Sequence, residues 1–254
     1  MEKIFEAAVR LVQSRYAVAL TGAGISVESG IPDFRSAGGL WSRYDPTEYA
    51  DIDSFKANPA KVWTMLFEMD EMLTRAQANP AHLVLAELER RGIIKAVITQ
   101  NVDSLHQRAG SSIVIEFHGH NRTLRCEGCG RRVKREDIAF DALAGSFPKC
   151  PCGGPMRPEV VFFGEGIPSQ AHSAAISEIE KCDLVLVVGT SATVAPASYL
   201  PVIAKKQGAF ILEINPTPTL LTDQMTDLHI AESAGRALAS ILAVMDEKAS
   251  LQRN

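Results

Sequence analysis

The residue types best suited to chemistry gather directly after short apolar runs of this sequence. The turn Gly22–Gly24 follows the run that ends at Thr21, with Ser26 and Val27 just beyond it. Glycines after a strand let the backbone approach a pyrophosphate, and a following helix N-terminus favours the anion. A dinucleotide fingerprint would have a third glycine where Val27 stands. The turn therefore fits either a phosphate site or an ordinary strand-to-helix connection.

A carboxylate, an aromatic ring and a guanidinium follow shortly afterwards, at Asp33, Phe34 and Arg35. Arg35 could pair with a phosphate, and Phe34 could cover a planar ring. The alternative is a capped loop in which Asp33 and Arg35 form a surface ion pair.

Polar side chains also follow two later apolar runs, at Gln100–Asp103 and at His118. Amides at a strand end suit a ribose or a carboxamide, although Asp103 could instead cap a helix. A histidine with a pKa near 6.5 is a candidate general base at neutral pH. A lone histidine at a strand end is, however, more often structural.

Four of the five cysteines have the spacing Cys126-x2-Cys129-x20-Cys150-x-Cys152. Two thiolate pairs about 20 residues apart can surround zinc tetrahedrally, although the second pair is one residue tighter than usual. Such a site leaves no open coordination position, so the zinc would be structural. The alternative is four reduced thiols in a loop without metal.

The stretch Pro158–Glu165 is extended and apolar. With an unpaired edge it could accept a peptide as an added strand. Without one it is an ordinary connecting strand.

The elements that must position these groups alternate between apolar runs and helical patterns. The runs cover residues 16–20, 94–98, 113–117, 184–188 and 210–214, and the helical patterns cover 3–13, 81–91, 169–181, 199–207 and 232–248. Continuous apolar strands that alternate with helices predict an α/β fold, a Rossmann-like parallel sheet with helices on both faces. Ligands of such sheets bind beyond the carboxyl ends of the strands.

Two stretches interrupt this alternation. Residues 37–78 are rich in Trp, Met and Phe and read as helices, with Pro46 and Pro59 at helix starts, while residues 121–157 hold the cysteine quartet. We therefore expect a Rossmann-like domain from residues 1–36, 79–120 and 158–254. Residues 37–78 and 121–157 are expected to form a smaller domain, made of a helical insertion and a zinc-binding module.

Composition narrows the class of protein. The chain has 254 residues and a net charge of −4, which argues against a partner bound through phosphate neutralisation, so no direct nucleic-acid contact is expected. No apolar run approaches the roughly 20 residues of a membrane span. The first ten residues carry Glu2 and Glu6 and do not resemble a signal peptide, so we expect a cytoplasmic location with reduced thiols.

Taken together and in this order, the motifs resemble the sirtuin family, the NAD-dependent protein-lysine deacylases, in a compact prokaryotic-type member. The likeness spans residues 17–234 and rests on GAGIS from Gly22, GIPDFR from Gly30, TQNVD from Thr99, His118-Gly119, the cysteine quartet, VVFFGE from Val160, GTS from Gly189 and EIN from Glu213. The resemblance implies NAD bound between the two domains. It also implies acyl transfer to ADP-ribose with release of nicotinamide, and acyl-lysine peptides bound as an added strand.

The resemblance also assigns roles to residues. His118 matches the base that acts on the ribose, Asn101 the residue that orients ribose and water, and Asp103 the one that recognises the carboxamide. The cofactor-binding set that it implies is Gly22, Ala23, Gly24, Ser26, Val27, Asp33, Phe34, Arg35, Gln100, Asn101, Val102, Asp103, Gly189, Thr190, Ser191, Asn215 and Ala234. The substrate-binding set is His118, Val160, Phe162, Phe163, Gly164 and Val194. Cys126, Cys129, Cys150 and Cys152 match the zinc ligands.

The same resemblance indicates an acyl preference. Family members that prefer succinyl groups carry a Tyr and an Arg three residues apart. When this chain is aligned with them without a gap between Trp63 and His82, Leu66 and Met69 occupy those two positions. We therefore expect acetyl or longer apolar acyl groups over succinyl. Two alternatives stay open: protein mono-ADP-ribosyl transfer at the same NAD site, and a non-catalytic NAD-sensing or zinc-ribbon interaction module.

Overall fold

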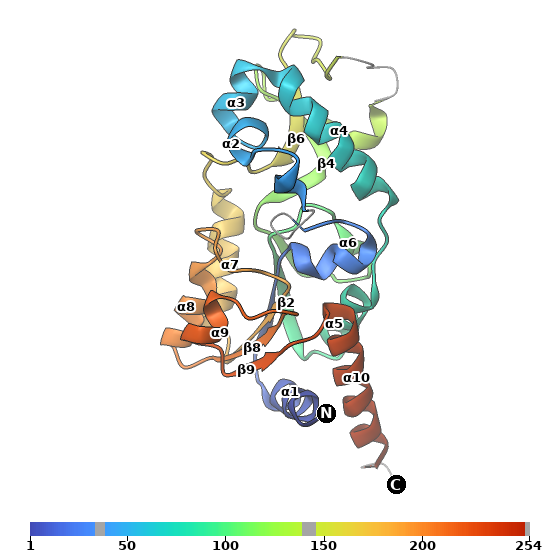
Figure 1. Ribbon diagram of the computed structural model, residues 1–254, viewed down its shortest axis with the longest axis vertical. Coiled ribbons are helices and arrows are strands. Elements are labelled where there is room, and N and C mark those ends of the chain that lie inside the picture. The colour runs from blue at the N-terminus through green and yellow to red at the C-terminus, as the bar shows by residue number, and fades with distance from the viewer. Residues whose placement is uncertain (34–38, 139–145, 252–254) are drawn as a thin grey trace.

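The computed structural model describes residues 1–33, 39–138 and 146–251, and a six-stranded parallel sheet forms its centre (Figure 1). The strands are β1 (Ala17–Thr21), β2 (Ile94–Thr99), β3 (Val114–Glu116), β7 (Leu184–Val188), β8 (Phe210–Ile214) and β9 (Leu228–Ile230), in the order β3-β2-β1-β7-β8-β9. The order reverses between β1 and β7. In a doubly wound sheet this reversal opens a crevice at the carboxyl ends of the strands, where ligands bind.

Helices cover both faces of this sheet because its central strands are buried on both sides. On β1, for example, Ala17 and Ala19 face one core while Val18 and Leu20 face the other. The first core is closed by α1 (Glu2–Gln13), α5 (Pro80–Arg90) and α10 (Ala234–Leu251), and the second by α7 (Ser169–Lys181) and α8 (Tyr199–Lys206). Among the described residues, no helix is long and apolar enough to cross a membrane.

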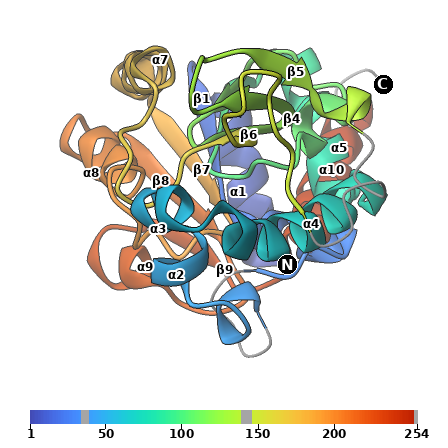
Figure 2. The same cartoon turned by 90° about the horizontal axis from the view of Figure 1, so that it is seen from above.

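A smaller unit lies at one end of the sheet and has a core of its own (Figures 1 and 2). It contains an antiparallel sheet of β4 (Gly119–Cys126), β5 (Arg132–Lys134) and β6 (Met156–Val160), with β4 in the middle. Helices α2 (Pro46–Tyr49), α3 (Ile52–Ala57) and α4 (Pro59–Arg75) pack beside it, with short 3-10 turns at Leu40–Ser42 and Arg135–Asp137. The buried Trp63 of α4 donates its indole N–H to the Met156 carbonyl at 2.8 Å, which joins helix to sheet.

Prolines and side-chain caps set where several helices begin. Proline stands at the first position of α2, α4 and α5, where its missing N–H costs no hydrogen bond. Asp45, Asn58 and Asn79 precede these prolines, and each accepts hydrogen bonds from backbone N–H groups of the first turn. The helix starts predicted at Pro46 and Pro59 are confirmed.

The five apolar runs and the predicted helices are all present, with ends within two or three residues of the prediction. The sequence patterns missed β9, the small sheet, and the one-turn helices α6 (Leu105–Arg108) and α9 (Leu220–Gln224). Strand β4 carries mostly polar residues, and little of it is buried. Strands β3 and β9 are equally short, but β3 lies within the apolar run 113–117, whereas β9 has a histidine at its centre and polar residues close by on both sides. Sequence patterns reveal strands that lie in an apolar run.

Candidate active site

A cavity of about 850 Å³ lies where the carboxyl ends of the sheet strands face the smaller unit. Its polar side comes from strand ends, namely Gly22, Ala23, Gly24, Gln100, Asn101, Val102, His118, Gly189, Thr190, Ser191 and Asn215. Its apolar side comes mainly from the smaller unit, namely Trp41, Ala50, Met65, Leu66, Met69, Val160 and Phe162. A ligand with a polar part and an apolar part matches this division.

The glycine turn after β1 packs directly against the turn after β7. A Cβ on Gly22 would lie 2.7 Å from the Thr190 Cβ, and one on Gly24 would lie 2.7 Å from the Gly189 Cα. Gly189 has a φ of +60°, and its own Cβ would lie 2.4 Å from the Ile25 nitrogen. Glycine is therefore required at these positions for the two strand ends to meet, whatever the cavity binds.

Asn101 has its amide hydrogens committed within the protein. Its Nδ2 donates to the Ser26 hydroxyl at 3.0 Å and to the Gly22 carbonyl at 3.2 Å. The Oδ1 atom is then the part of the amide left to accept a hydrogen bond from a ligand or a water in the cavity.

Asp103 lies behind Asn101 and is buried. Its Oδ2 accepts from the Ser26 hydroxyl at 2.7 Å, and its Oδ1 accepts from the Leu105 backbone N–H at 2.9 Å. The helix-cap interpretation of Asp103 is thus present in the structure, because the second bond caps α6. The same carboxylate fixes Ser26, and through it the orientation of Asn101.

His118 lines the cavity, and the Gln100 carbonyl determines its tautomer. Its Nδ1 lies 3.1 Å from the Gln100 carbonyl oxygen, which can only accept, so Nδ1 carries the proton. Burial lowers the pKa of His118, and the bond to Gln100 only partly opposes this shift. The imidazole is therefore neutral at pH 7, with an unprotonated Nε2 that can take up a proton.

The remaining polar residues are tied to one another at the ends of β7 and β8. Gln100 donates from Nε2 to the Thr190 hydroxyl at 2.9 Å, and Asn215 donates from Nδ2 to the Thr190 carbonyl at 3.1 Å. Ser191 and Thr193 pair through their hydroxyls at 3.0 Å. These contacts hold the polar side of the cavity in shape before any ligand binds.

Not all of the predicted site residues line the cavity. Most of them line the cavity, including Asp33, Phe163, Gly164 and Val194 at its edges. Val27 is 48% exposed and Ala234 is buried in the sheet core, and neither lines the cavity. Ser26 and Asp103 are buried and do not line it either, so the predicted contact of Asp103 with the carboxamide stays a prediction. Phe34 and Arg35 lie outside the described residues.

The patterns missed several lining residues. Trp41, Ala50 and Ile167 also border the cavity, as does Pro218 beyond β8. Trp41 and Ala50 belong to the insertion rich in large apolar residues, and this composition was the only signal for them.

The segment after β6 is held on both sides. The Val161 N–H donates to the His118 carbonyl at 2.9 Å, and the Phe163 N–H donates to the Ala50 carbonyl at 2.8 Å. The Ile52 N–H donates to the Phe163 carbonyl at 3.0 Å. Residues 161–163 therefore offer little free edge to an added strand.

The cysteine quartet has the geometry of a zinc site. The sulfur atoms lie within 4.8 Å of one another, and the Cys126–Cys152 and Cys129–Cys150 sulfur pairs are 3.5 and 3.7 Å apart. Tetrahedral zinc with bonds of about 2.3 Å requires sulfur separations of roughly 3.8 Å. A hydrogen bond from the Cys129 backbone N–H lowers the pKa of Cys126 to about 7, which favours the thiolate that binds metal.

Comparison with known proteins agrees with this site. The model of the Sir2 family matches residues 22–196, from the glycine turn past the cysteine quartet. NAD-dependent protein deacylase 2 of Archaeoglobus fulgidus is 47% identical over 243 residues, which is 95% of each protein. NAD-dependent protein deacylase of Pyrococcus furiosus is 46% identical over 235 residues, 91% of this chain and 94% of the relative.

Solved structures extend the match to the whole fold. A Sir2 homologue in complex with NAD has a TM-score of 0.87 and 43% identity, covering 95% of this chain and 94% of its own. Sir2Af2 bound to a myristoylated histone peptide has a TM-score of 0.83 and 40% identity, covering 98% of both chains.

Together, the Rossmann-like sheet, the cavity at its switch point and the tetrathiolate cluster define a nucleotide-dependent enzyme with a structural metal module. The chain belongs to the Sir2 family of NAD-dependent protein deacylases. NAD is its cosubstrate, and the four cysteines fit one structural zinc.

Proposed function

We propose that this enzyme removes acetyl and longer apolar acyl groups from lysine side chains of proteins, in preference to succinyl groups, with His118 as its general base. The observation that supports this proposal is the state and position of His118. Its neutral imidazole, bonded through Nδ1 to the Gln100 carbonyl, lines a cavity that has one polar and one apolar side. NAD, when bound, supplies the ribose that accepts the acyl group and the nicotinamide that leaves.

The polar side of the cavity is assigned to NAD. The turns at Gly22–Gly24 and Gly189–Ser191 would receive the phosphates, and Asn215 the adenosine ribose. The donors would be the N–H groups of Ala23, Thr190 and Ser191, because those of the three glycines already bond backbone carbonyls. Asn101 would orient the nicotinamide ribose and a water through Oδ1, held in place by Ser26 and Asp103. His118 would then take a proton from a ribose hydroxyl at Nε2.

The apolar side is assigned to the acyl chain. Leu66 and Met69 line it, with Met65, Val160 and Phe162. Among the described lining residues there is no lysine or arginine to pair with a succinyl carboxylate. Burying an unpaired carboxylate is costly, so an apolar acyl group is favoured.

The peptide backbone is assigned to the rim of the cavity. Residues 164–167 and 193–195 border the same rim, and Phe163 beside them is 42% exposed. An extended peptide could add as a strand between these two segments, with its lysine directed inward. The net charge of −4 supports a protein partner over nucleic acid, and the four free thiols of the metal site support a reducing, cytoplasmic setting.

The decisive experiment offers NAD with acetyl-, octanoyl- and succinyl-lysine forms of one peptide and identifies the products by mass spectrometry. We expect O-acyl-ADP-ribose and nicotinamide from the apolar acyl peptides, with kcat/KM for succinyl at least tenfold lower. Faster turnover of the succinyl peptide would refute the specificity. ADP-ribose retained on protein without O-acyl-ADP-ribose would instead favour mono-ADP-ribosyl transfer.

A further inference from the structure

Arg157 is a buried cation that the deacylation chemistry leaves without a role. Its side chain is only 2% exposed, although it lies on β6 just before the acyl-lysine segment. A guanidinium cannot lose its charge inside a protein, so it must find partners there.

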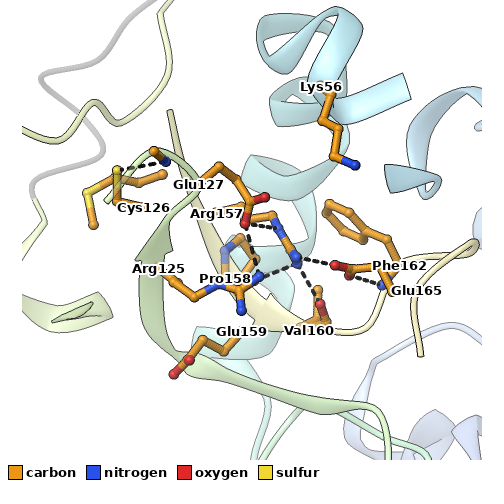
Figure 3. Close-up of polar contacts among 12 residues, drawn as sticks. Lys56, Arg125, Cys126, Glu127, Arg157, Pro158, Glu159, Val160, Phe162 and Glu165 are labelled. Carbon is orange, nitrogen blue, oxygen red and sulfur yellow. Dashed lines mark hydrogen bonds and ion pairs between the residues drawn. The ribbon is translucent and has the colours of Figure 1, made fainter. Parts of the chain in front are cut away.

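Two carboxylates and two carbonyls meet this guanidinium (Figure 3). Nε donates to Glu127 at 3.0 Å and Nη2 donates to Glu165 at 2.5 Å. Nη1 donates to the Val160 carbonyl at 2.8 Å and to the Pro158 carbonyl at 3.5 Å. The guanidinium carbon also lies 4.8 Å from the centre of the Phe162 ring. One planar group thus touches three residues of the segment from Val160 to Glu165.

The partners on the substrate side form a closed turn. Glu165 accepts the Phe162 N–H at 2.9 Å through its second carboxylate oxygen, while its own N–H donates to the Phe162 carbonyl at 3.0 Å. Gly164 between them has a φ of +83°, which suits glycine. The Arg157 contact with Glu165 therefore fixes the conformation of the turn that borders the cavity.

The partner on the other side belongs to the zinc module. Glu127 stands between the ligands Cys126 and Cys129, and its N–H donates to the Pro155 carbonyl at 3.0 Å. Arg125, opposite Arg157 in the β4–β6 register, also donates to Glu127, at 3.0 Å. Two like charges face each other across the sheet, and the carboxylate between them compensates both.

We propose that Arg157 is a positioning residue for the acyl-lysine substrate, one that holds the 160–165 segment in its binding conformation and ties it to the Cys126–Cys129 turn. This inference rests on the proposed function, because it assumes that acyl-lysine lies against Val160 and Phe162. Arg157 itself does not line the cavity, so it acts through the 160–165 segment.

The test compares Arg157→Met, which keeps the length of the side chain without its charge, with Arg157→Lys. In Arg157→Met we expect the Kd of an acetyl-lysine peptide to rise at least tenfold, while the Kd of NAD changes by less than twofold. KM for the peptide should rise with kcat within threefold of wild type. Arg157→Lys should give a peptide Kd between those of Arg157→Met and the wild type, since one ammonium cannot serve all four partners.

Release of zinc to a chromogenic chelator provides a readout that does not depend on turnover. We expect Arg157→Met to release zinc at least threefold faster than wild type, because Glu127 loses a partner. Unchanged release would overturn the tie to the cysteine turn. Arg132→Gln is the matched control: its pair with Glu159 bridges strands of the same sheet at 2.7 Å, but Arg132 is 64% exposed. It should change neither affinity nor zinc release.

Equal losses of NAD and peptide affinity, or no loss of either, would overturn the positioning role. If Arg157→Met does not fold, Arg157→Lys carries the test, and wild-type peptide affinity in that variant overturns the proposal. If the wild-type protein neither binds nor turns over any acyl-lysine peptide, the proposed function itself fails. The binding measurements therefore separate the two failures.

Discussion

Hydrogen bonds to neighbouring residues determine the protonation and the orientation of the candidate catalytic side chains. The proton on Nδ1 of His118 follows from one backbone carbonyl, that of Gln100, and the orientation of the Asn101 amide follows from Ser26 and Gly22. Because all three partners come from segments that follow other strands, the types of residue could be recognised in the sequence but their protonation and orientation could not. Asp103 serves as helix cap and as support for Ser26, so the two interpretations of this residue do not exclude each other.

Replacing His118 with Ala should lower kcat/KM for an acetyl-lysine peptide by about 10²–10⁴-fold, the usual contribution of a general base. NAD binding should change little and the melting temperature should fall only modestly, since the variant loses the bond to the Gln100 carbonyl and the edge contact with the Phe117 ring. The measurement is steady-state kinetics with calorimetric NAD titration. His172→Ala is the control, because this histidine is exposed and does not line the cavity.

The pH profile of the wild-type enzyme tests the same assignment. Burial lowers the pKa of His118 below 6.5, so most of the base is unprotonated at pH 7 and activity is lost as the pH falls through the lowered pKa. We expect kcat/KM to be flat from pH 7 to 8 and to fall below pH 6.5. An acidic limb centred above pH 7 would contradict this.

At the scale of elements, the two turns at the switch point and the cysteine turns depend on close backbone approach. Gly22, Gly24 and Gly189 allow the ends of β1 and β7 to meet, and a Cβ on Gly154 would lie 2.8 Å from the Cys126 sulfur. Sequence patterns indicated Gly22, Gly24, Gly189 and the four thiols. They indicated only the end of β6, through the extended stretch from Pro158, and they did not indicate β4, whose mostly polar residues carry no strand period. The pairing of β4 with β6 helps to bring the cysteines together.

Replacing Cys126 with Ser should remove one zinc ligand and loosen the smaller unit. We expect zinc content to fall well below one per chain, and the melting temperature to fall by about 5–10 °C if a few kcal/mol are lost in a chain of this size. Metal analysis and thermal denaturation are the measurements. Cys182→Ser is the matched control, since this thiol is buried outside the cluster and donates to the Ile179 carbonyl at 3.1 Å, a bond that serine can make. Equal zinc loss in both variants would contradict the assignment.

At the scale of the whole molecule, the cavity exists because two separately packed bodies meet. The sheet and its helices could be predicted because long apolar runs alternate with helical patterns. The way residues 40–72 and 124–162 share one core could not, since that depends on contacts such as Trp63 with Met156, 93 positions apart. Local periodicity contains no information on such pairings, which is why Trp41 and Ala50 went unrecognised as lining residues.

Two buried histidines connect the stability of the sheet body to pH. His82 of α5 and His106 of α6 meet edge to face with ring centres 4.9 Å apart, and the His106 Nε2 lies 2.9 Å from the Thr21 hydroxyl at the end of β1. Burial lowers the pKa of His82 to about 4 and that of His106 to about 3. Since the unfolded chain binds these protons near pH 6.5, the stability from each neutral imidazole is complete above pH 6.5 and is lost as the pH falls toward the folded-state values.

At pH 5 we expect each imidazole to lower the free energy of unfolding by about 2 kcal/mol. This pH lies roughly 1.5 units below the unfolded-state pKa but still above the folded-state values, so only the unfolded chain binds the proton. Urea denaturation at pH 7.5 and pH 5 measures it. In His106→Gln, whose amide can still bond Thr21, the difference in unfolding free energy between the two pH values should shrink by about this amount. His172→Gln, which removes an exposed imidazole, should retain the wild-type difference. If His106→Gln retains it as well, the buried pair does not govern the acid sensitivity of the fold.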